Sequence, residues 1–514
     1  MDTDMKACRC PNLMIISYYT GYIIMAVGVL NLISLIISLL LAEWNPALDF
    51  AISFSLTDIV GLLMVLIGYP AHKKKVKIQW RHGFVAAALS WILLMFLCSV
   101  PYLLSGHTNS LLDGCFDVMS GFTTTGLSLI QDLDHISVGL NIWRHILTFV
   151  GGQGMVVLAL TTLLKNTGGA YKFYVGEAKD VELVPNVKGT ARMIWKISMI
   201  YLLIGTAALW LIGMQIGLRP LNALYQGFCI FASAWSTGGF APTSMNIMFY
   251  HSFLYENVTI LFFILGSLNF GLHYAVWNGN RKELTKNIEV QSFIITSFSA
   301  CAFAVAKLSK SGIYTDAVSL FRRVVYNVLS AHTTTGFNTV YSKQFILQWG
   351  DFAILIMIVA MLIGGSACST AGGFKGLRVG IVCKGILADV KRLISSERNV
   401  RSVKYHNMKD SILDDTAIKA ATLIIICYVV TFAAGTLLGT YFGYPLTEAA
   451  FESASVAGNV GLSIGVTSAS MPAAMKVFYI ISMYLGRLEF LSVFALIGYF
   501  FGGVKKVCQN RFSR

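Results

Sequence analysis

Four short phrases rich in glycine, threonine and serine recur along the chain, and each lies between two apolar stretches. They are SGFTTTGLS at 120–128, SAWSTGGFA at 233–241, SAHTTTGFN at 330–338 and SVAGNVGLS at 455–463. Aligned on a shared glycine, each copy has a serine six residues before it and leucine or phenylalanine directly after it. Such loops offer carbonyl and hydroxyl oxygens, which are the ligands that hard cations prefer.

Four loops of this kind around one axis would form a ring of carbonyl oxygens that replaces the hydration shell of a cation, as in a potassium filter. Glycine favours this arrangement because it accepts positive φ angles, which turn successive carbonyls the same way. The alternative is that the phrases are close-packing contacts between helices, but four copies in register favour the filter. The predicted filter residues are Thr124, Thr125, Gly126, Thr237, Gly238, Gly239, Thr334, Thr335, Gly336, Asn459, Val460 and Gly461.

A further run of small residues, IGGSACSTAGGFKG at 363–376, interrupts the apolar stretch after the third phrase. Non-helical backbone at membrane depth must be buried in protein or line a cavity, so the run predicts a broken helix below the filter. Two interpretations stay open: a movable gate with Lys375 as a tether to acidic or backbone partners, or a static packing kink. The residues of this predicted gate loop are Gly364, Gly365, Ser366, Ser369, Gly372, Gly373 and Lys375.

Four ionisable residues lie near these features. Arg487 falls inside the last apolar stretch, and a charge at membrane depth is a candidate functional residue; it is expected to face the pore as an electrostatic barrier, or else to pair with Glu489. Asp117 and Glu452 precede the first and fourth phrases and are expected to support short helices rather than bind the ion. His332 is expected to be a hydrogen-bonded structural group rather than a proton relay.

The composition places these features in a membrane. The 514 residues are 56% hydrophobic and 12% charged, with a mean hydropathy of +0.67, whereas soluble domains carry roughly 25% charged residues. A helix needs about 20 apolar residues to cross the hydrocarbon core. The ten candidate spans are about 14–42, 49–70, 83–104, 139–164, 193–217, 250–278, 290–308, 350–384, 415–440 and 473–503.

Each phrase sits in the same frame of apolar span, short segment, phrase and apolar span. The predicted fold is therefore an all-α polytopic membrane protein. A fourfold pseudo-repeat of helix, pore half-helix, filter loop and helix surrounds one central pore, preceded by two extra transmembrane helices. The predicted units are 1–78 (N-terminal helix pair), 79–180, 181–288, 289–405 and 406–514 (pore modules 1 to 4, the third with a broken second helix).

The formal net charge of +14 is concentrated in the linkers around 71–82 and 385–410 and in the C-terminus. The positive-inside rule places these segments, and with them both termini, on the cytoplasmic side. Because the basic residues are dispersed juxtamembrane flanks, they do not indicate nucleic-acid binding.

The sequence carries no catalytic motif of the P-loop, H-E-x-x-H or G-x-S-x-G type, so neither an enzyme nor an organic cofactor is expected. The ten cysteines are scattered, and they are expected to be small buried hydrophobes without disulfide or metal roles.

These residues resemble the membrane subunit of the Trk/Ktr potassium uptake systems, within the Trk/Ktr/HKT superfamily. The resemblance covers about residue 80 to the end. It rests on SGFTTTG at 120–126, STGGF at 236–240, TTTGF at 333–337, GNVGLSIG at 458–465, GGSACSTAGGFKG at 364–376 and LGRLE at 485–489.

The resemblance implies four two-helix modules around one pore, the four shared glycines as filter glycines, a gate loop in the third module and Arg487 as the pore arginine. It also implies a homodimer with one pore per protomer and a cytosolic nucleotide-binding regulatory subunit that this chain lacks. In plant relatives serine at the first filter glycine goes with sodium transport, so Gly126 favours potassium. The extra N-terminal spans look like the Trk branch, whereas the fourth phrase looks like the Ktr branch.

The sequence therefore predicts a potassium-selective, channel-like uptake protein of the plasma membrane, in particular a bacterial inner membrane, with K⁺ as the transported ion. The main alternative is a sodium-permeable or cation-coupled symporter of the same fold. An intramembrane enzyme would need a catalytic pair that the spans lack. Four intact glycines argue against a sensory protein with an inactive filter.

Overall fold

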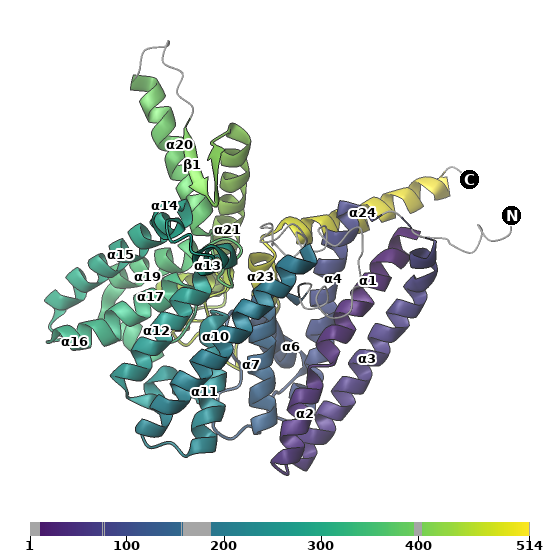
Figure 1. The fold of residues 1–514 in the computed structure, drawn as a ribbon, viewed down its shortest axis with the longest axis horizontal. Coiled ribbons are helices and arrows are strands. Elements are labelled where there is room, and N and C mark those ends of the chain that lie inside the picture. Colours follow the sequence, from purple (N-terminus) through teal and green to yellow (C-terminus); the bar gives the residue numbers. More distant parts are fainter. Residues whose placement is uncertain are drawn as a thin grey trace.

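A computed structural model gives the fold of the chain (Figure 1). It describes residues 11–512 except 75, 77, 156, 158–186 and 395–402. The described part is mainly helical, which confirms the predicted class. It also contains a two-stranded antiparallel hairpin that the sequence analysis did not predict.

The N-terminal helices pack side by side as an antiparallel pair. α1 (Pro11–Gly28) continues after a short break as α2 (Asn31–Leu40), and α3 (Trp44–Lys73) runs back along both. The contact is close because glycines face one another: a Cβ built on Gly21 would lie 2.6 Å from the carbonyl oxygen of Gly61. Small residues at helix contacts let backbones approach in lipid, where no hydrophobic effect drives helices together.

The first predicted module begins with a long helix and a short one. It contains α4 (Trp80–Cys98), α5 (Val100–Leu104), α6 (Leu111–Phe122) and α7 (Val138–Gln153). Ser110 caps α6 by accepting a hydrogen bond from the amide of Asp113, and Ser137 caps α7 in the same way. These caps satisfy amides that have no partner within the first turn. The end of the predicted span 139–164, at residues 156 and 158–164, lies outside the described residues.

The second predicted module has a bend that the sequence analysis missed. Its helices are α10 (Val187–Gln215), α11 (Pro220–Trp235), η1 (Asn246–Tyr250, a 3₁₀ helix), α12 (Phe253–Ser267) and α13 (Phe270–Trp277). α12 and α13 meet at 100°, so the stretch 250–278 is a bent pair and not one straight span. Asn269 starts the new direction by accepting a hydrogen bond from the amide of Gly271.

The third predicted module contains the broken helix. After α14 (Glu283–Lys286), which ends the second predicted module, come α15 (Ile288–Leu308), η2 (Ser309–Ser311), α16 (Ala317–Ser319), η3 (Leu320–Val325), α17 (Tyr326–His332), α18 (Ser342–Gln344), η4 (Phe345–Trp349), α19 (Gly350–Ile363) and α20 (Gly376–Ile394). The chain between α19 and α20 is not helical. A break within the predicted span 350–384 is therefore present.

The fourth predicted module begins within the hairpin. Its elements are β1 (Lys404–Asn407), β2 (Lys409–Ile412), α21 (Asp415–Tyr441), α22 (Leu446–Ala457), α23 (Ala473–Arg487) and α24 (Leu491–Phe512). His406 in β1 contacts both Asp410 and Glu283, and these two acids raise the pKa of its ring. α23 and α24 meet at 112°, so the stretch 473–503 is also bent.

The helices are long and apolar enough for a multi-pass membrane protein. Within the described residues, seven helical segments are long and apolar enough to cross a membrane, or nine when each bent pair is counted as one span. Large apolar side chains on their outer faces are exposed, such as Leu203 (72%) and Phe298 (74%), as expected where the solvent is lipid. Most described cysteines are fully or partly buried and all are free, but Cys383 is exposed, contrary to expectation.

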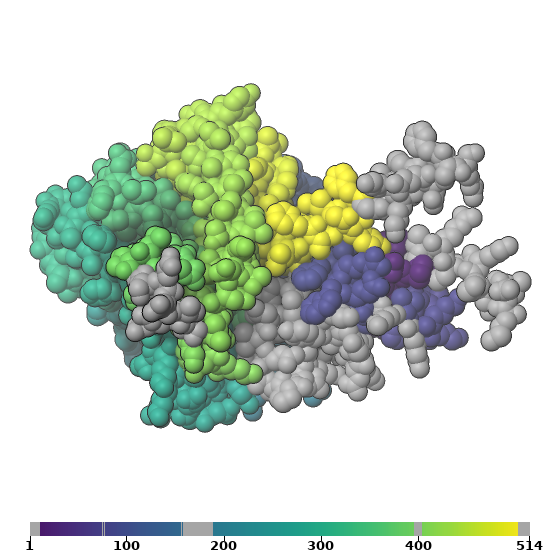
Figure 2. Space-filling view, turned by 90° about the horizontal axis from the view of Figure 1, so that it is seen from above, coloured from purple at the N-terminus to yellow at the C-terminus, as the bar shows by residue number. Residues whose placement is uncertain are grey.

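Seen from above, the yellow C-terminal helices lie between the green elements and the purple N-terminal ones (Figure 2). The yellow helix α24 extends toward the purple N-terminal helices, and it packs against α4. The last helix thus reaches back to the start of the first module.

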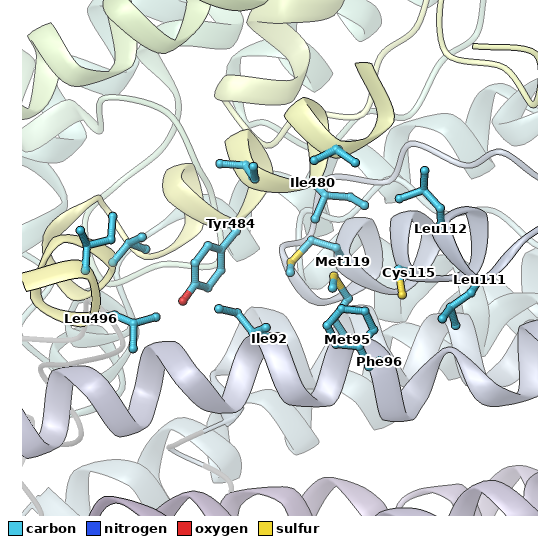
Figure 3. A pocket seen from close by; sticks show the side chains of 14 residues that line it. Ile92, Met95, Phe96, Leu111, Leu112, Cys115, Met119, Ile480, Tyr484 and Leu496 are labelled. Carbon is cyan, nitrogen blue, oxygen red and sulfur yellow. The ribbon is translucent and has the colours of Figure 1, made fainter. Parts of the chain in front are cut away.

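A cavity of about 540 Å³ lies between α4, α6, α23 and α24. Figure 3 shows Met95, Met119, Leu496 and the ring of Tyr484 around it. Its lining is apolar almost throughout. This lining offers a cation almost no oxygen ligands, so the cavity is not a candidate binding site for one.

Candidate ion site

The four phrases adopt the same local structure at the ends of four helices. Each begins in the last turn of α6, α11, α17 or α22 and continues beyond the end of that helix. In each, the carbonyl oxygen of the shared serine accepts a hydrogen bond of 2.8 Å from the amide directly before the shared glycine. The donor and acceptor pairs are Thr125 and Ser120, Gly238 and Ser233, Thr335 and Ser330, and Val460 and Ser455.

The backbone angles of the four phrases also agree. The residue two before each glycine has a positive φ: Thr124 +55°, Thr237 +49°, Thr334 +56° and Asn459 +55°. The glycines themselves have φ of +84° at Gly126, +66° at Gly239, +83° at Gly336 and +89° at Gly461. Left-handed residues that alternate with ordinary ones turn successive peptide groups to the same side, and glycine adopts this conformation without strain.

The four phrases contact one another in cyclic order. A Cβ built on any of the four glycines would collide with a backbone carbonyl oxygen of the next phrase, and the fourth returns to the first. The colliding pairs are Gly126 with Gly238, Gly239 with Thr335, Gly336 with Val460, and Gly461 with Thr125. Segments more than 300 residues apart in sequence therefore close a ring of backbone.

The ring is buried and lacks charged side chains. The threonines of the first three phrases, Asn459 and Val460 are all 0% exposed. No cluster of three or more histidine, cysteine, aspartate or glutamate residues that could hold a metal is found in the described part of the chain. The ring thus offers backbone carbonyl and hydroxyl oxygens, which suit a hard monovalent cation rather than a transition metal.

In three of the four phrases, a polar side chain nine residues before the shared glycine accepts a hydrogen bond from the backbone just after the phrase. Asp117 Oδ1 accepts from the amide of Leu129 at 3.0 Å, and Glu452 Oε1 accepts from the amide of Ile464 at 3.1 Å. Asn327 Oδ1 accepts from the amide of Thr339 at 3.4 Å at the equivalent place in the third phrase. The second phrase has Ile230 there. The sequence analysis missed Asn327, although its spacing to Gly336 matches the two acids.

Replacing Glu452 with alanine is expected to destabilise the protein markedly. Glu452 also accepts from the amide of Val466 and the hydroxyl of Thr467. A buried donor left without an acceptor costs about 1–3 kcal/mol, so the total loss should reach about 3 kcal/mol. The melting temperature of the purified protein measures this. Glu452→Gln keeps one carbonyl acceptor and should lose less, and Glu448→Ala on the same helix is the control. An unchanged melting temperature in Glu452→Ala would contradict this role.

The segment between α19 and α20 contacts all four phrases. The amide of Gly372 donates to Thr334 Oγ1 at 2.8 Å. Thr124 Oγ1 donates to the Thr370 carbonyl at 3.4 Å, and the hydroxyls of Thr237 and Thr370 lie 3.1 Å apart. A Cβ on Gly372 would collide with the carbonyl oxygen of Gly458, within the fourth phrase. The segment between α19 and α20 therefore lies directly against the ring.

The other predicted loop residues shape this segment. Gly364 (φ +72°) and Gly373 (φ +76°) pack against each other where no Cβ would fit. The amide of Ser366 donates to the Ser267 carbonyl at 2.9 Å, and Ser369 Oγ donates to the Ser366 carbonyl at 2.6 Å. Gly365 also packs on Ser267. Sequence reasoning left out Thr370, whose hydroxyl donates to the Gly266 carbonyl at 2.8 Å.

Charged side chains hold this segment at its middle, through Thr370, and at its C-terminal end, through Lys375. Arg487 donates to the carbonyl of Thr370 at 2.6 Å, and to those of Gly151 and Gly152 at 2.7 and 2.9 Å. Glu489 pairs with Lys375 at 2.5 Å and also with Arg378. Arg487 therefore joins the segment to the end of α7, while Lys375 has the acidic partner that the tether interpretation requires.

Two ion pairs outside the ring join different predicted modules; the first is buried and the second partly buried. Lys476 at the start of α23 lies 2.7 Å from Asp113 at the start of α6, so the fourth module contacts the first. Arg322 in η3 forms two hydrogen bonds of 2.8 Å with Glu256 in α12. His332 accepts or donates a hydrogen bond of 2.8 Å with Thr296 and packs on Phe293, as expected for a structural histidine.

Comparisons with known proteins point to one family. The model of the TrkH family, described as a cation transport protein, matches residues 59–294 and 288–498. An uncharacterized cation transporter of Methanocaldococcus jannaschii is 27% identical over 484 residues, which are 94% of each chain. The Trk system potassium uptake protein TrkH of Escherichia coli K12 is 27% identical over 454 residues, covering 86% of this chain and 91% of the relative.

A solved structure shows the same fold. The crystal structure of the potassium transporter TrkH from Vibrio parahaemolyticus superposes with a TM-score of 0.79 at 24% identity. It covers 95% of this chain and 98% of that one.

Proposed function

The chain belongs to the TrkH family of cation transport proteins, and from this premise we propose that it is a potassium-selective, channel-like uptake protein. The relatives named as potassium uptake proteins support potassium as the ion. In this proposal the four phrases form the selectivity filter of one pore, built from a fourfold pseudo-repeat, and K⁺ is bound by their carbonyl oxygens.

The single observation that carries the proposal is the closed ring of four phrases with matching backbone. Each phrase repeats the hydrogen bond to the carbonyl oxygen of its shared serine and has positive φ angles at the same two positions. Each phrase also contacts the next. Such a ring can replace the hydration shell of a cation. A set of unrelated packing contacts would not need the same angles four times.

The short helices before the phrases support a cation rather than an anion. α6, α11, α17 and α22 each end directly at the ring. The C-terminal end of a helix carries a partial negative charge of roughly half an elementary charge. Four such ends around one axis favour a monovalent cation and disfavour an anion.

In this proposal the segment 364–376 is the gate, with Arg487 holding it closed. Its contacts to all four phrases support a position where it would close the exit from the ring. Hydrogen bonds to three carbonyls can be broken and reformed without breaking a packed core, which suits a movable element. The arginine charge next to the path would add an electrostatic barrier to a cation.

We also propose the assembly and orientation that the family resemblance implies. Two copies would associate with one pore each and bind a cytosolic nucleotide-binding regulatory subunit. The basic segments at 71–82 and 385–410 support placement of both termini on the cytoplasmic side. On the same side, α20 exposes Leu393 (87%) and Ile394 (81%), which would suit a protein partner more than water.

The test is growth of a bacterium that lacks potassium uptake, at limiting potassium, with this chain expressed. Rescue is expected, together with rubidium uptake and little sodium uptake. Failed rescue with sodium entry would contradict potassium selectivity and favour the sodium-permeable alternative. Co-expression of a family regulatory subunit serves as the control for a missing partner.

A further inference from the structure

The N-terminal transmembrane span is broken near its middle. α1 ends at Gly28 and α2 begins at Asn31, within one apolar stretch of 30 residues from Pro11 to Leu40. Across the break amides bond to carbonyls three residues back, from Leu30 to Val27 and from Ile33 to Leu30. Backbone that departs from a helix at membrane depth occurs where protein buries it or a polar site uses it.

Polar side chains gather at this break. Asn31 donates its amide to the Gly28 carbonyl oxygen at 3.0 Å. From α3, Thr57 and Asp58 pack against the same glycine: a Cβ on Gly28 would lie 3.1 Å from Thr57 Cγ2 and 2.5 Å from Asp58 Oδ2. Glycine at position 28 thus leaves room for the carboxylate of Asp58 beside the side chain of Asn31.

The oxygens in this cluster lack partners. Within the part of the chain that the structure describes, Asn31 Oδ1, Thr57 Oγ1 and Asp58 Oδ2 are buried and form no hydrogen bond. Asn31 and Thr57 are both 0% exposed. A buried polar atom without a partner costs about 1–3 kcal/mol, so three together indicate that something else contacts them.

The cluster extends by one turn along both helices. The antiparallel register pairs Gly21 with Val65, Met25 with Gly61 and Gly28 with Asp58. The same register places Ser34 of α2 beside Ser53 of α3. Both serines are 0% exposed, and their hydroxyl oxygens also have no partner among the described residues.

No basic side chain of the facing span neutralises Asp58. Residues 11–42 contain no lysine, arginine or histidine and no acid. A carboxylate at membrane depth is costly without a counter-charge. The surrounding atoms are a carboxylate, an amide oxygen and hydroxyls, which together are ligands for a hard cation.

We propose that Asp58, Asn31 and Thr57 form a buried binding site for one small monovalent cation of the sodium type, with Ser34 and Ser53 as polar neighbours one turn away. The single carboxylate balances one positive charge, and the neutral oxygens replace part of the hydration shell. The site lies outside the ring of the four phrases, so it stands or fails independently of the proposed transport function. Its bound cation would lock the N-terminal helices together beside the first module.

Thermal unfolding of the purified full chain tests the site. The protein is kept in choline chloride and titrated with sodium, lithium or potassium at constant ionic strength. Sodium is expected to raise the melting temperature saturably, by roughly 1–2 °C at ten times its dissociation constant. Asp58→Asn should abolish the sodium shift, whereas Asp49→Asn on the same helix should keep it. Potassium also reaches the ring, so a potassium shift that survives in Asp58→Asn is expected.

A milder variant keeps the test decisive if Asp58→Asn does not fold. Thr57→Val retains the shape of the side chain and removes one oxygen, so it should raise the sodium midpoint by about tenfold, the equivalent of 1.4 kcal/mol. An equal sodium shift in wild type and Asp58→Asn would overturn the proposal. Stabilisation by acid alone, with no response to any alkali cation, would also overturn it, because Asp58 would then be neutralised by a proton.

Discussion

Gly126→Ser is expected to lower the ratio of rubidium to sodium uptake at least tenfold. The φ of Gly126 is +84°, and a Cβ there would collide with the carbonyl oxygen of Gly238 in the next phrase. A residue with a Cβ in this conformation costs roughly 1–2 kcal/mol before any collision. A change of 1.4 kcal/mol in the relative binding of two ions is tenfold, so even partial relaxation of the ring should be measurable.

Gly465→Ser is the matched control for this substitution. Gly465 has a φ of +109°, but a Cβ there would meet no atom within 4 Å. It therefore carries the backbone strain without the collision with the ring. Uptake of both ions by vesicles or whole cells measures the ratio. If Gly126→Ser kept the wild-type ratio in a folded protein, the assignment of this glycine to the filter would be wrong.

Deleting residues 366–373 is expected to raise potassium flux at least tenfold. The segment contacts all four phrases, and Arg487 holds the Thr370 carbonyl at 2.6 Å. A hydrogen bond contributes about 1 kcal/mol net. Loss of a few such bonds should shift the balance between closed and open states by one to two orders of magnitude. Rubidium flux into proteoliposomes measures the change.

A single substitution gives the finer test of the same segment. Thr370→Val removes the hydroxyl bonds to the Gly266 and Trp235 carbonyls but keeps the backbone. It should raise flux by a smaller factor than the deletion. Thr440→Val is the control, because that hydroxyl bonds only to carbonyls of its own helix. Wild-type flux in a folded deletion variant would favour the static packing kink over the gate.

The sequence predicted the membrane class, the family and the positions of the four phrases, because repetition and apolar length are visible without coordinates. It also predicted the broken helix at 364–376, since glycine and serine in such density cannot face lipid. It missed the bends at Leu268 and Leu488. Apolar runs lie on both sides of each turn, and the change of direction is marked by the cap of Asn269 at the first and by the positive φ of Glu489 and Phe490 at the second.

The side-chain contacts of the site could be predicted less well from the sequence. The sequence singled out Arg487 and Lys375 as charges at membrane depth, but their partners, the Thr370 carbonyl and Glu489, depend on how distant helices pack. Asn327 escaped notice because it is neutral and common in loops. The ion pair of Lys476 with Asp113 joins residues 363 positions apart, and no local pattern indicates such a pair.

The ring closes through four different segments of a single polypeptide, and this has a consequence for how the protein can change. In an assembly of four identical subunits, one codon alters all four quarters of the ring together. Here one codon alters one quarter and leaves three intact. The fourth quarter already differs, with Asn459 and Val460 where the first and third have two threonines. If the ring is the proposed filter, its ion preference can therefore change one quarter at a time.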